Sequence, residues 1–344
     1  MIKVGIIGAT GYAGAELVRI LINHPEAEIV AVGSKSFDGK KLSEVYPSLC
    51  GFCDAICEDN SLVVDKSEVI FACLPHGLSE EIAAQCDKKG KKFIDLGADF
   101  RLSDENDYRE WYGLEYHCKN LHEKAVYGLP ELFLEDIRGA DIIANPGCYP
   151  TSAALGLFPA IEKDFVLTDN IVIDAKSGVT GAGRGLSQTT HYPDCNEAFS
   201  PYKVAMHRHT PEIEQTLSIA AKKPIKVTFV PHLLPVNRGI ISTMYVKTAA
   251  GVTKQMMREA YEQKYSNCKF VRVLEDGNVA NLKNVRYSNM CDISLHFDDR
   301  TGTFIVVSAI DNMVKGAAGQ AVQNMNIIFG LDYETGLNMV PPAF

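Results

Sequence analysis

The chain has 344 residues, of which 46% are hydrophobic and 22% charged, and its formal net charge at pH 7 is −9. This length exceeds what a single hydrophobic core usually supports, so we expect a globular protein of two domains. There is no Lys/Arg-rich run and no apolar run long enough for a membrane span, which argues against a nucleic-acid-binding protein and a membrane protein. The first residues lead straight into an apolar strand rather than a signal peptide, so we expect a cytoplasmic protein.

The first part of the chain has the pattern of a parallel sheet with helices between its strands. Short apolar runs that fit buried strands occur at residues 2–7, 29–32, 69–74, 93–96 and 141–144. Helical spacing is found between two pairs of these runs, over 16–22 and over 78–89. We therefore predict an α/β domain of the Rossmann type.

The pattern changes after Cys148. Helices are predicted at 152–162, 211–222 and 253–265, and strands, mostly longer and rich in β-branched residues, at 170–175, 225–230, 240–248, 291–297 and 303–310. Long strands with few crossovers indicate an α+β domain with a mixed or antiparallel sheet. We expect the last helix, at 316–329, to return to the first domain. The predicted domains are therefore residues 1–147 with 313–344, and residues 148–312.

Three glycines, Gly8, Gly11 and Gly14, follow the first strand and precede the first helix. Glycines in such a turn let the backbone approach a pyrophosphate, which then lies at the N-terminus of the helix. Thr10 and Tyr12 belong to the same turn. The spacing is GxxGxxG rather than GxGxxG, so a merely tight turn is the alternative. In its strand–helix context the motif predicts a dinucleotide site.

The end of the second strand bears on which dinucleotide binds. An NAD site would place an Asp or Glu there against the ribose 2′-hydroxyl, whereas this chain has Ser34, Lys35 and Ser36. Hydroxyls and a lysine suit a 2′-phosphate, so we predict NADP as the cofactor. The alternative is that Lys35 is an ordinary solvated lysine.

Cys148 stands between turn formers in the string IANPGCYPT, at the end of an apolar run. Pro and Gly break the strand and an apolar helix follows, so the sulfur should face the backbone N–H groups of a helix start. Such groups stabilise a thiolate and a developing oxyanion, and we predict that Cys148 is a nucleophile. On spacing alone it could also be a small buried hydrophobe at a strand-to-helix corner.

The string HRHTPE suggests a base for this sulfur. We predict that Thr210 caps a helix whose first residue is Pro211, so that His207 and His209 lie in the extended segment before it. Residues i and i+2 of an extended chain share a face, which points both imidazoles the same way and Arg208 the opposite way. A helix N-terminus keeps a histidine neutral and able to accept a proton. The alternative is a pair of surface histidines.

Two further stretches could contact a ligand. Arg101 follows a predicted strand and can hold a phosphate or carboxylate with its forked N–H groups, unless it pairs with Asp99 or Asp104. Ser177 and Gly178 begin a stretch with four glycines, which indicates a backbone pressed against a ligand or, alternatively, a glycine-rich surface turn. We predict contact with the cofactor for Ser177 and Gly178.

The ten cysteines are expected to be thiols in a reducing cytosol. Cys50 and Cys53 form a CxxC with Cys57 close by, which could indicate zinc or a redox pair. No second CxxC or HxxxH follows at the spacing of a zinc site, so we predict no metal.

Seven strings spread over the chain carry a resemblance to a known family: GATGYAGAELVRIL, DLGADFRL, NPGCYPT, DAKSGVTGAGRG, HRHTPEIEQ, VPHLLPVNRG and DNMVKGAAGQAVQNMN. With them the chain resembles the N-acetyl-γ-glutamyl-phosphate reductases of arginine biosynthesis, which are similar to aspartate-semialdehyde dehydrogenase. The resemblance implies that NADPH reduces N-acetyl-glutamyl 5-phosphate to the 5-semialdehyde through a thioester on Cys148. It also implies a homodimer or homotetramer.

The resemblance further implies roles for individual residues. The acid–base histidine falls on residues 207–209, where we prefer His207, with His209 and Glu212 orienting the substrate or the base. Our candidate for binding the leaving phosphate is Arg101.

For the substrate carboxylate the candidates are Arg208 and Arg238, and Asn312 is predicted to border the cofactor. One alternative function is that of a sister enzyme, aspartate-semialdehyde dehydrogenase or another phosphorylating aldehyde dehydrogenase. A more distant alternative is a non-catalytic, dinucleotide-binding regulator.

Overall fold

The computed structural model describes all residues from Met1 to Phe344. The chain separates into two compact units. Unit 1 comprises Met1–Pro146 and Ala317–Met339, and unit 2 comprises Gly147–Gly316 and Val340–Phe344. The last helix therefore groups with the N-terminal residues. None of the helices is both long enough and apolar enough to cross a bilayer.

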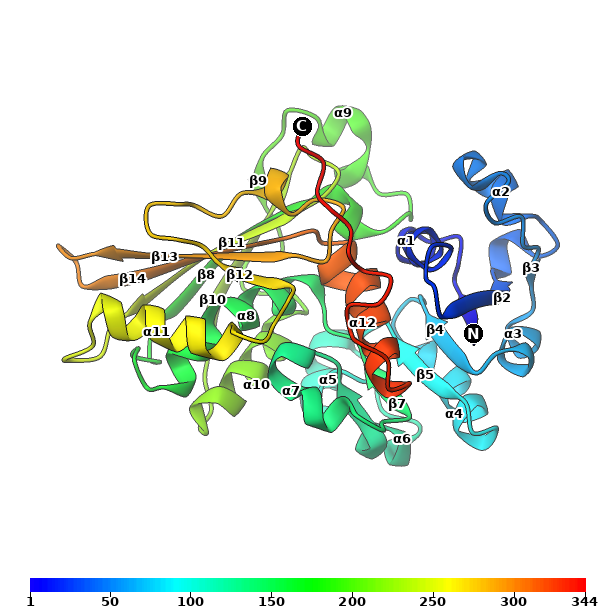
Figure 1. Ribbon diagram of the computed structural model, residues 1–344, viewed down its shortest axis with the longest axis horizontal. Helices are drawn as coiled ribbons and strands as arrows, with labels where there is room; N and C mark the ends of the chain where they lie inside the picture. The colour runs from blue at the N-terminus through cyan, green and yellow to red at the C-terminus, as the bar shows by residue number, and fades with distance from the viewer. The chain divides into compact units, whose positions relative to one another are not determined.

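The sheet of unit 1 has seven strands, all parallel, in the order β3-β2-β1-β4-β5-β7-β6 (Figure 1). Their bounds are β1 (Ile2–Ile7), β2 (Ala27–Gly33), β3 (Cys57–Glu58), β4 (Val69–Ala72), β5 (Lys92–Asp95), β6 (Ala125–Tyr127) and β7 (Ile142–Ala144). The prediction of a parallel Rossmann-type sheet is confirmed. The predicted runs correspond to five of these strands, and β3 and β6 were missed.

Helices cover both faces of this sheet. Their bounds are α1 (Tyr12–Leu21), α2 (Leu42–Val45), α3 (Asn60–Lys66), α4 (Ser79–Lys88), α5 (Glu105–Tyr112), α6 (Lys119–Lys124), α7 (Pro130–Ile137) and α12 (Gly319–Ile328). Helix α12 contacts α1 and α7, whereas α4 contacts α3 and α6, as expected for the two layers of a doubly wound sheet. Strand β1 lies in the middle and ends at the glycine turn, where such sheets bind nucleotides.

The sheet of unit 2 is mixed and has the strand order β12-β13-β14-β11-β8-β10-β9. The pairs β8–β10 and β12–β13 are parallel and the other neighbours antiparallel, which confirms the predicted mixed sheet. The bounds are β8 (Ile171–Gly178), β9 (Ser200–Pro201), β10 (Val227–Leu234), β11 (Ile240–Lys247), β12 (Val271–Val273), β13 (Cys291–Asp298) and β14 (Thr303–Ile310).

The core of unit 2 lies around α8 (Cys148–Glu162), whose residues from Tyr149 to Ile161 are all buried. This helix contacts β11 and β14 on one side and α10 (Thr210–Ala221) and α11 (Lys254–Tyr265) on the other. Pro159 lies inside α8 and has no N–H to donate to the Leu155 carbonyl. The Tyr265 hydroxyl donates to that carbonyl instead, at 2.6 Å, so α11 satisfies the acceptor that the proline leaves over.

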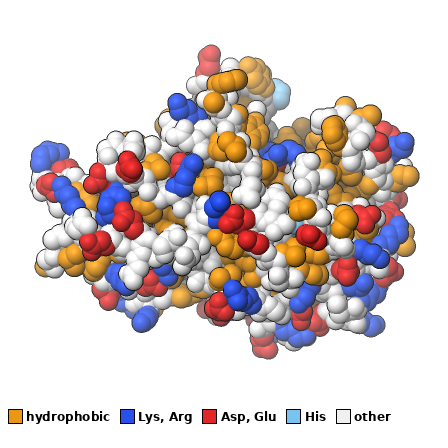
Figure 2. All heavy atoms as spheres, viewed as in Figure 1, with side chains coloured by type: hydrophobic (Ala, Val, Ile, Leu, Met, Phe, Trp, Pro, Cys, Tyr) orange, Lys and Arg blue, Asp and Glu red, His pale blue; other side chains and the backbone are white.

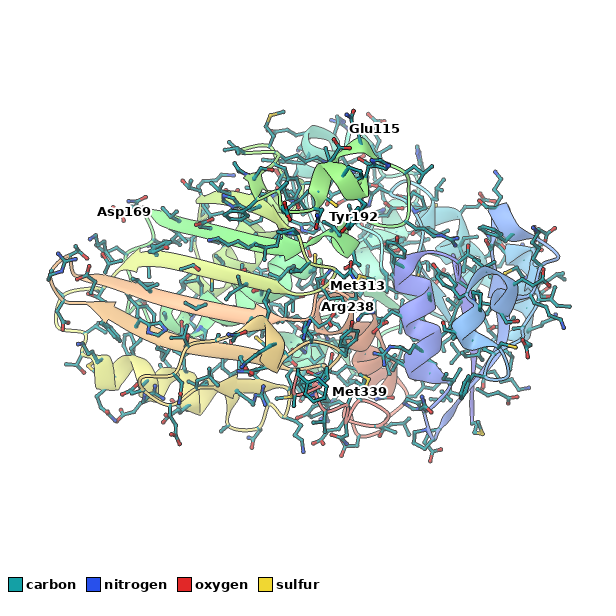
Figure 3. The ribbon with its side chains drawn as sticks, turned by 90° about the horizontal axis from the view of Figure 1, so that it is seen from above. Glu115, Asp169, Tyr192, Arg238, Met313 and Met339 are labelled. Atoms are coloured by element: carbon teal, nitrogen blue, oxygen red, sulfur yellow. The ribbon has the colours of Figure 1, made fainter.

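The short elements of unit 2 are α9 (Tyr192–Cys195) and three 3₁₀ turns at Val179–Ala182, Gln188–Thr190 and Leu282–Asn284. A π-helical turn at Val314–Ala318 runs from the residues of unit 2 into those of unit 1. Strand pairing places Ser177 near the end of β8 opposite Ile240 at the start of β11, which in turn pairs with Ile310 at the end of β14. These strand ends therefore share one edge of the sheet. In Figure 3, Asp169 and Arg238 mark opposite ends of the strands, and Met313 lies at the Arg238 end.

Charged side chains of both signs are interspersed on the face shown in Figure 2. On this face the acidic side chains are therefore not gathered in one patch. An anionic substrate would have to be bound by a local group of cations.

Candidate active site

Cys148 is the first residue of α8, and Gly147 before it is the N-cap. Gly147 has extended dihedral angles, and its carbonyl accepts both the N–H and the hydroxyl of Thr151 at 2.9 Å. The Cys148 side chain is half-buried. Because the peptide dipoles of this 15-residue helix point their positive end at the first turn, a thiolate at Cys148 is stabilised there.

A buried carboxylate holds the start of this helix. Glu212, in the first turn of α10, is fully buried, and its Oε1 accepts the Gly147 N–H at 2.8 Å. The hydrogen bond satisfies one of the backbone donors at the start of α8 and joins two helices at the residue before Cys148. The structure thus brings Glu212 and Cys148 together, with the carboxylate bound to the backbone.

The segment with the two histidines is a turn, so our prediction of an extended segment was wrong. The N-cap of α10 is His209, and Thr210, which we predicted to be the cap, is the first helical residue. His209 has helical dihedral angles (φ −79°, ψ −9°), and its N–H donates to the His207 Nδ1 at 3.1 Å, which closes the turn. The two imidazoles still lie together, with 4.9 Å between their centroids.

His207 is buried among aromatic side chains. Three rings lie at a centroid distance of 5.4 Å from it, those of Tyr149, Tyr202 and Phe229. Burial, helped by the charges of Lys203 and Arg208, lowers the pKa of His207 to about 3, so this imidazole is neutral at neutral pH. Its Nδ1 accepts a backbone N–H, so the proton of the neutral ring is on Nε2, which lies 3.3 Å from the Tyr202 hydroxyl.

Tyr149 and Tyr202 are site residues that we did not predict. Their hydroxyls lie 3.3 Å apart. Burial raises the pKa of both phenols, to about 12 for Tyr202, and negative charge on the neighbouring Cys148 also acts to raise it. Both hydroxyls therefore stay protonated close to the sulfur. Tyr149 follows Cys148 in the chain and could have been noticed, whereas Tyr202 follows a short edge strand in a loop-rich region without a recognisable motif.

The glycine turn of unit 1 has the shape of a pyrophosphate-binding turn. Gly8 has a φ of 80°, and a Cβ there would overlap the Cys73 carbonyl. A Cβ at Gly14 would overlap the Gly8 carbonyl and lie 2.6 Å from the Ala9 Cα. Gly11 is the N-cap of α1 and provides no side-chain cap for the first N–H groups of the helix. The turn therefore fits an anion at the N-terminus of α1.

The other residues predicted to bind the cofactor in unit 1 lie around this turn. The hydroxyls of Thr10 and Ser34 are buried and hydrogen-bonded to each other at 2.7 Å. Lys35 and Ser36 are exposed in a 3₁₀ turn directly after β2. Tyr12, the first residue of α1, is exposed as well. The structure thus brings the predicted cofactor residues of unit 1 to the ends of β1 and β2.

Ser177, Gly178 and Asn312 are engaged within unit 2. The Ser177 hydroxyl donates to the Gly178 carbonyl at 3.0 Å. A Cβ at Gly178 would lie 2.7 Å from the backbone of the turn before β11, so close packing of the chain explains this glycine. The Asn312 amide accepts the Gly239 N–H at 2.7 Å and donates to the Thr180 hydroxyl at 3.0 Å. Their contact with a cofactor stays a prediction.

The predicted arginine of unit 1 joins two strand ends. Arg101 is buried, and it donates from Nε to the Asn145 carbonyl and from Nη2 to the Leu96 carbonyl, both at 2.8 Å. These carbonyls follow β7 and β5, respectively. Two donor atoms of Arg101 are therefore used to hold the backbone, which limits how many remain for a phosphate.

The two predicted arginines of unit 2 differ in their surroundings. Arg208 is half-buried next to His207. Burial lowers the pKa of Lys203, and the charge of the nearby Arg208 lowers it further. These two cations form the local positive charge that an anionic substrate needs. Arg238 instead forms an ion pair with the fully buried Asp311, at 3.4 Å.

No group of three or more His, Cys, Asp or Glu side chains lies close enough to hold a metal ion, and all ten cysteines are free thiols. Burial, with smaller effects of Asp38 and Cys53, raises the pKa of Cys57, and burial raises the pKa of Cys86 to about 12. Such thiols stay protonated and unreactive at neutral pH. Cys148 differs from them because it lies at a helix start.

Comparison with known proteins places these observations in a family context. Residues 3–140 match the family described as "Semialdehyde dehydrogenase, NAD binding domain", and residues 148–312 match "Semialdehyde dehydrogenase, dimerisation domain". The chain is 56% identical to the N-acetyl-gamma-glutamyl-phosphate reductase of Brachyspira hyodysenteriae and 52% identical to that of Clostridium beijerinckii. Both alignments cover 100% of this chain and 100% of the relative.

The fold also resembles solved structures. An aspartate semialdehyde dehydrogenase with NADP from Candida albicans superposes with a TM-score of 0.70 at 18% sequence identity. The match covers 95% of this chain and 98% of that chain. At this identity the likeness is one of fold.

Proposed function

The chain belongs to the N-acetyl-γ-glutamyl-phosphate reductase family, and from this premise we propose that it reduces N-acetyl-L-glutamyl 5-phosphate to N-acetyl-L-glutamate 5-semialdehyde, with NADPH, in arginine biosynthesis. The observation that supports the chemistry best is Cys148 at the start of α8, in the same unit as a pair of histidines. A thiolate in such a place attacks an acyl phosphate and divides a difficult reduction into two easier steps.

In the first step the Cys148 sulfur attacks the acyl carbon. A carbon–sulfur bond forms, the carbon–oxygen bond to the phosphoryl group breaks, and phosphate leaves. The start of α8 stabilises the thiolate before the attack, and its N–H groups stabilise the oxyanion of the tetrahedral adduct. A histidine takes the thiol proton and passes it to the departing phosphate.

We assign this proton transfer to His209, although the family resemblance led us to prefer His207. The Nδ1 of His207 already accepts a backbone N–H, its Nε2 carries the proton, and its pKa of about 3 makes it a weak base. His209 is half-buried, and its ring lies 6.0 Å from that of Tyr149, the residue next to Cys148. His207 then orients His209, because its Nδ1 bonds the His209 backbone.

In the second step the thioester is reduced and the aldehyde leaves. NADPH, for which the glycine turn before α1 would provide the binding site, would supply the hydride for this reduction. The N–H groups at the start of α8 hold the resulting oxyanion, and its collapse breaks the carbon–sulfur bond. The sulfur departs as a thiolate, for which Tyr149 and Tyr202 provide protonated hydroxyls nearby.

For the cofactor we propose NADPH rather than NADH. The strand end at Ser34 offers no carboxylate to a ribose hydroxyl, and Lys35 and Ser36 are exposed where a 2′-phosphate would need them. Replacing Lys35 by Ala should raise KM for NADPH about tenfold, the value of one charge-assisted contact, and leave KM for NADH unchanged. A wild-type preference for NADH would contradict the proposal.

For the substrate we propose that Arg208 and Lys203 bind its anionic groups, because they supply positive charge around His207. Arg101 remains a candidate for the leaving phosphate, with fewer donors than we expected. Replacing Arg208 by Met should raise KM for the acyl phosphate much more than it lowers kcat. A fall in kcat with an unchanged KM would show that Arg208 does not bind the substrate.

A coupled assay distinguishes this function from the alternatives. It follows phosphate-dependent reduction of NADP⁺ with N-acetyl-glutamate semialdehyde and, in parallel, with aspartate semialdehyde. We expect clear preference for the first aldehyde and no turnover by Cys148→Ser. A preference for aspartate semialdehyde would mean a sister enzyme, and an unaffected Cys148→Ser variant would mean a non-catalytic role for the thiol.

We also propose that the protein self-associates as a homodimer, or as a homotetramer built from it, through the sheet of unit 2. The face of β8 and β11 opposite α8 carries half-buried side chains, among them Val172, Asp174 and Tyr245. The matching family description for this unit is a dimerisation domain. Light scattering should show a dimer or tetramer for the wild type and a smaller species for Tyr245→Asp. A monomeric wild type would contradict the proposal.

A further inference from the structure

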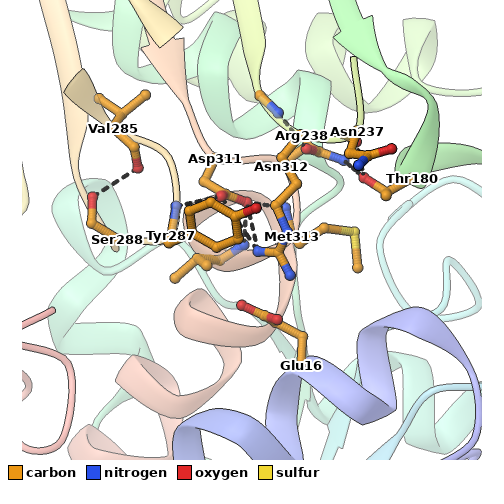
Figure 4. Close-up of polar contacts among 12 residues, drawn as sticks. Glu16, Thr180, Asn237, Arg238, Val285, Tyr287, Ser288, Asp311, Asn312 and Met313 are labelled. Atoms are coloured by element: carbon orange, nitrogen blue, oxygen red, sulfur yellow. Dashed lines mark hydrogen bonds and ion pairs between the residues drawn. The ribbon is translucent and has the colours of Figure 1, made fainter. Parts of the chain in front are cut away.

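The end of β14 carries a buried carboxylate to which the mechanism assigns no role. Asp311 is fully buried. Its Oδ1 accepts the N–H groups of Met313 at 2.8 Å and Val314 at 3.1 Å, and its Oδ2 accepts the Tyr287 N–H at 2.6 Å. Figure 4 shows Asp311 at the centre of these contacts, with Arg238 as its charged partner.

The guanidinium of Arg238 contacts two groups of unit 2. Its Nη1 lies 3.4 Å from the Asp311 Oδ2, and its central carbon lies 4.7 Å from the centroid of the Tyr287 ring. The ring covers the guanidinium by a cation–π contact, and the carboxylate neutralises its charge. Tyr287 has a φ of 61°, a strained value for a residue with a side chain, and its N–H bonds Asp311. Such a conformation costs free energy and persists because the surrounding contacts hold it.

The carboxylate also closes the turn that packs on the nucleophile. The backbone carbonyl of Asp311 accepts the Gly316 N–H at 2.9 Å. The carboxylate and the carbonyl of Asp311 together therefore fix the conformation of residues 311–316. A Cβ at Gly316 would lie 2.7 Å from the Cys148 Cβ and 3.2 Å from its Cα. The turn is therefore in direct contact with the backbone of Cys148, and any shift of it is transmitted to that residue.

We propose that Asp311 and Arg238 act as one positioning pair for Cys148, and that Arg238 is not a ligand of the substrate carboxylate. The pair fixes the 311–316 turn, and the turn fixes the place of the sulfur at the start of α8. The proposal rests on the proposed function for its effect on turnover, but the reactivity of the thiol does not depend on which substrate the enzyme uses.

The experiment compares Asp311→Asn, Arg238→Met and the double variant with the wild type. The first readout is the rate at which iodoacetamide alkylates Cys148 from pH 5 to 10, resolved from the other cysteines by peptide mass spectrometry. The second is kcat and KM for the acyl phosphate. Both single variants should lower kcat on the order of tenfold to a hundredfold, leave KM within about threefold and change the alkylation profile. The double variant should lower kcat no further than the more damaging of the two single variants.

Asp292→Asn is the matched control. Asp292 is a buried carboxylate of the same unit with its own arginine partner, Arg272, at 2.6 Å on the neighbouring strand β12. Its loss should lower the unfolding temperature without changing the alkylation profile of Cys148. If it alters alkylation as Asp311→Asn does, the effect is general loosening of the unit, and the positioning role is refuted.

Two further variants keep the test decisive if the first ones do not fold. Arg238→Lys preserves the charge and should recover part of kcat, and Gly316→Ala disturbs the turn while the ion pair stays intact. Gly316→Ala should reproduce the altered alkylation profile. If Arg238→Met or Arg238→Lys raises KM with alkylation unchanged, Arg238 binds substrate and the proposal fails. If the wild type is inactive on N-acetyl-glutamyl phosphate, the proposed function fails, and alkylation still decides the positioning role.

Discussion

Replacing Glu212 by Ala tests how the start of α8 is held. The carboxylate is fully buried and accepts the Gly147 N–H at 2.8 Å, so its removal leaves a backbone donor buried without this acceptor. Such a donor costs about 1–3 kcal/mol, and the loss of the one buried methylene that alanine lacks adds about 1 kcal/mol. We therefore expect the free energy of unfolding to fall by about 2–4 kcal/mol. Because Gly147 precedes Cys148, kcat should fall as well.

Guanidinium denaturation measures the first quantity and NADPH oxidation the second. Glu212→Gln is the control, because its amide oxygen can accept the same N–H without the charge, and it should cost about 1 kcal/mol or less. Equal losses for Gln and Ala would show that the charge matters and the hydrogen bond does not. A Glu212→Ala variant within about 0.5 kcal/mol of the wild type would refute the anchoring role altogether.

Three further predictions concern the histidines, the glycine turn and a buried acid. His209→Asn should lower kcat by about 10²–10⁴-fold and remove a limb of the pH–rate profile, whereas His207→Asn should lower kcat by a smaller factor. Equal and mild falls in kcat for the two variants would exclude both histidines as the base. Gly14→Ala should destabilise unit 1 by about 1–3 kcal/mol and raise KM for NADPH, because the new Cβ overlaps the Gly8 carbonyl; a variant with normal KM and unfolding midpoint would contradict this. Burial and the neighbouring Asp99 raise the pKa of Asp95 to about 7. In the unfolded chain this carboxyl loses its proton above about pH 4. The folded state therefore binds the extra proton between about pH 4 and 7, and the contribution of Asp95 to stability falls as pH rises through this range. The free energy of unfolding of Asp95→Asn, measured in urea, should therefore rise relative to that of the wild type by about 2 kcal/mol between pH 5 and 7.5. A difference between the two proteins that does not change with pH would refute the assignment.

The parts of the fold that the sequence predicted are those with a local hydrophobic signal. The apolar runs of β1, β2, β4, β5 and β7 are buried in the middle of the sheet, and their composition alone indicates strands. The edge strands β3 and β6 have two and three residues and no such run. They exist because a neighbouring strand offers free hydrogen-bonding groups, which is a tertiary effect.

The same distinction applies to the site. Cys148 could be predicted because its turn formers and its helix are adjacent in the sequence. The conformation of the histidine segment could not, because the His207 side chain closes the turn on the backbone of His209 and overrides the extended pattern. The Arg238–Asp311 pair joins residues 73 positions apart, and nothing local to either residue indicates it.

The central claim is that Cys148 carries the acyl group during the reaction. The most direct measurement is mass spectrometry of the protein incubated with N-acetyl-glutamyl phosphate in the absence of NADPH, followed by peptide mapping. We expect an N-acetyl-glutamyl thioester on Cys148 in the wild type, lost on addition of NADPH with release of the semialdehyde, and no adduct in Cys148→Ser. An acyl group on another residue, or full turnover by Cys148→Ser, would contradict the account.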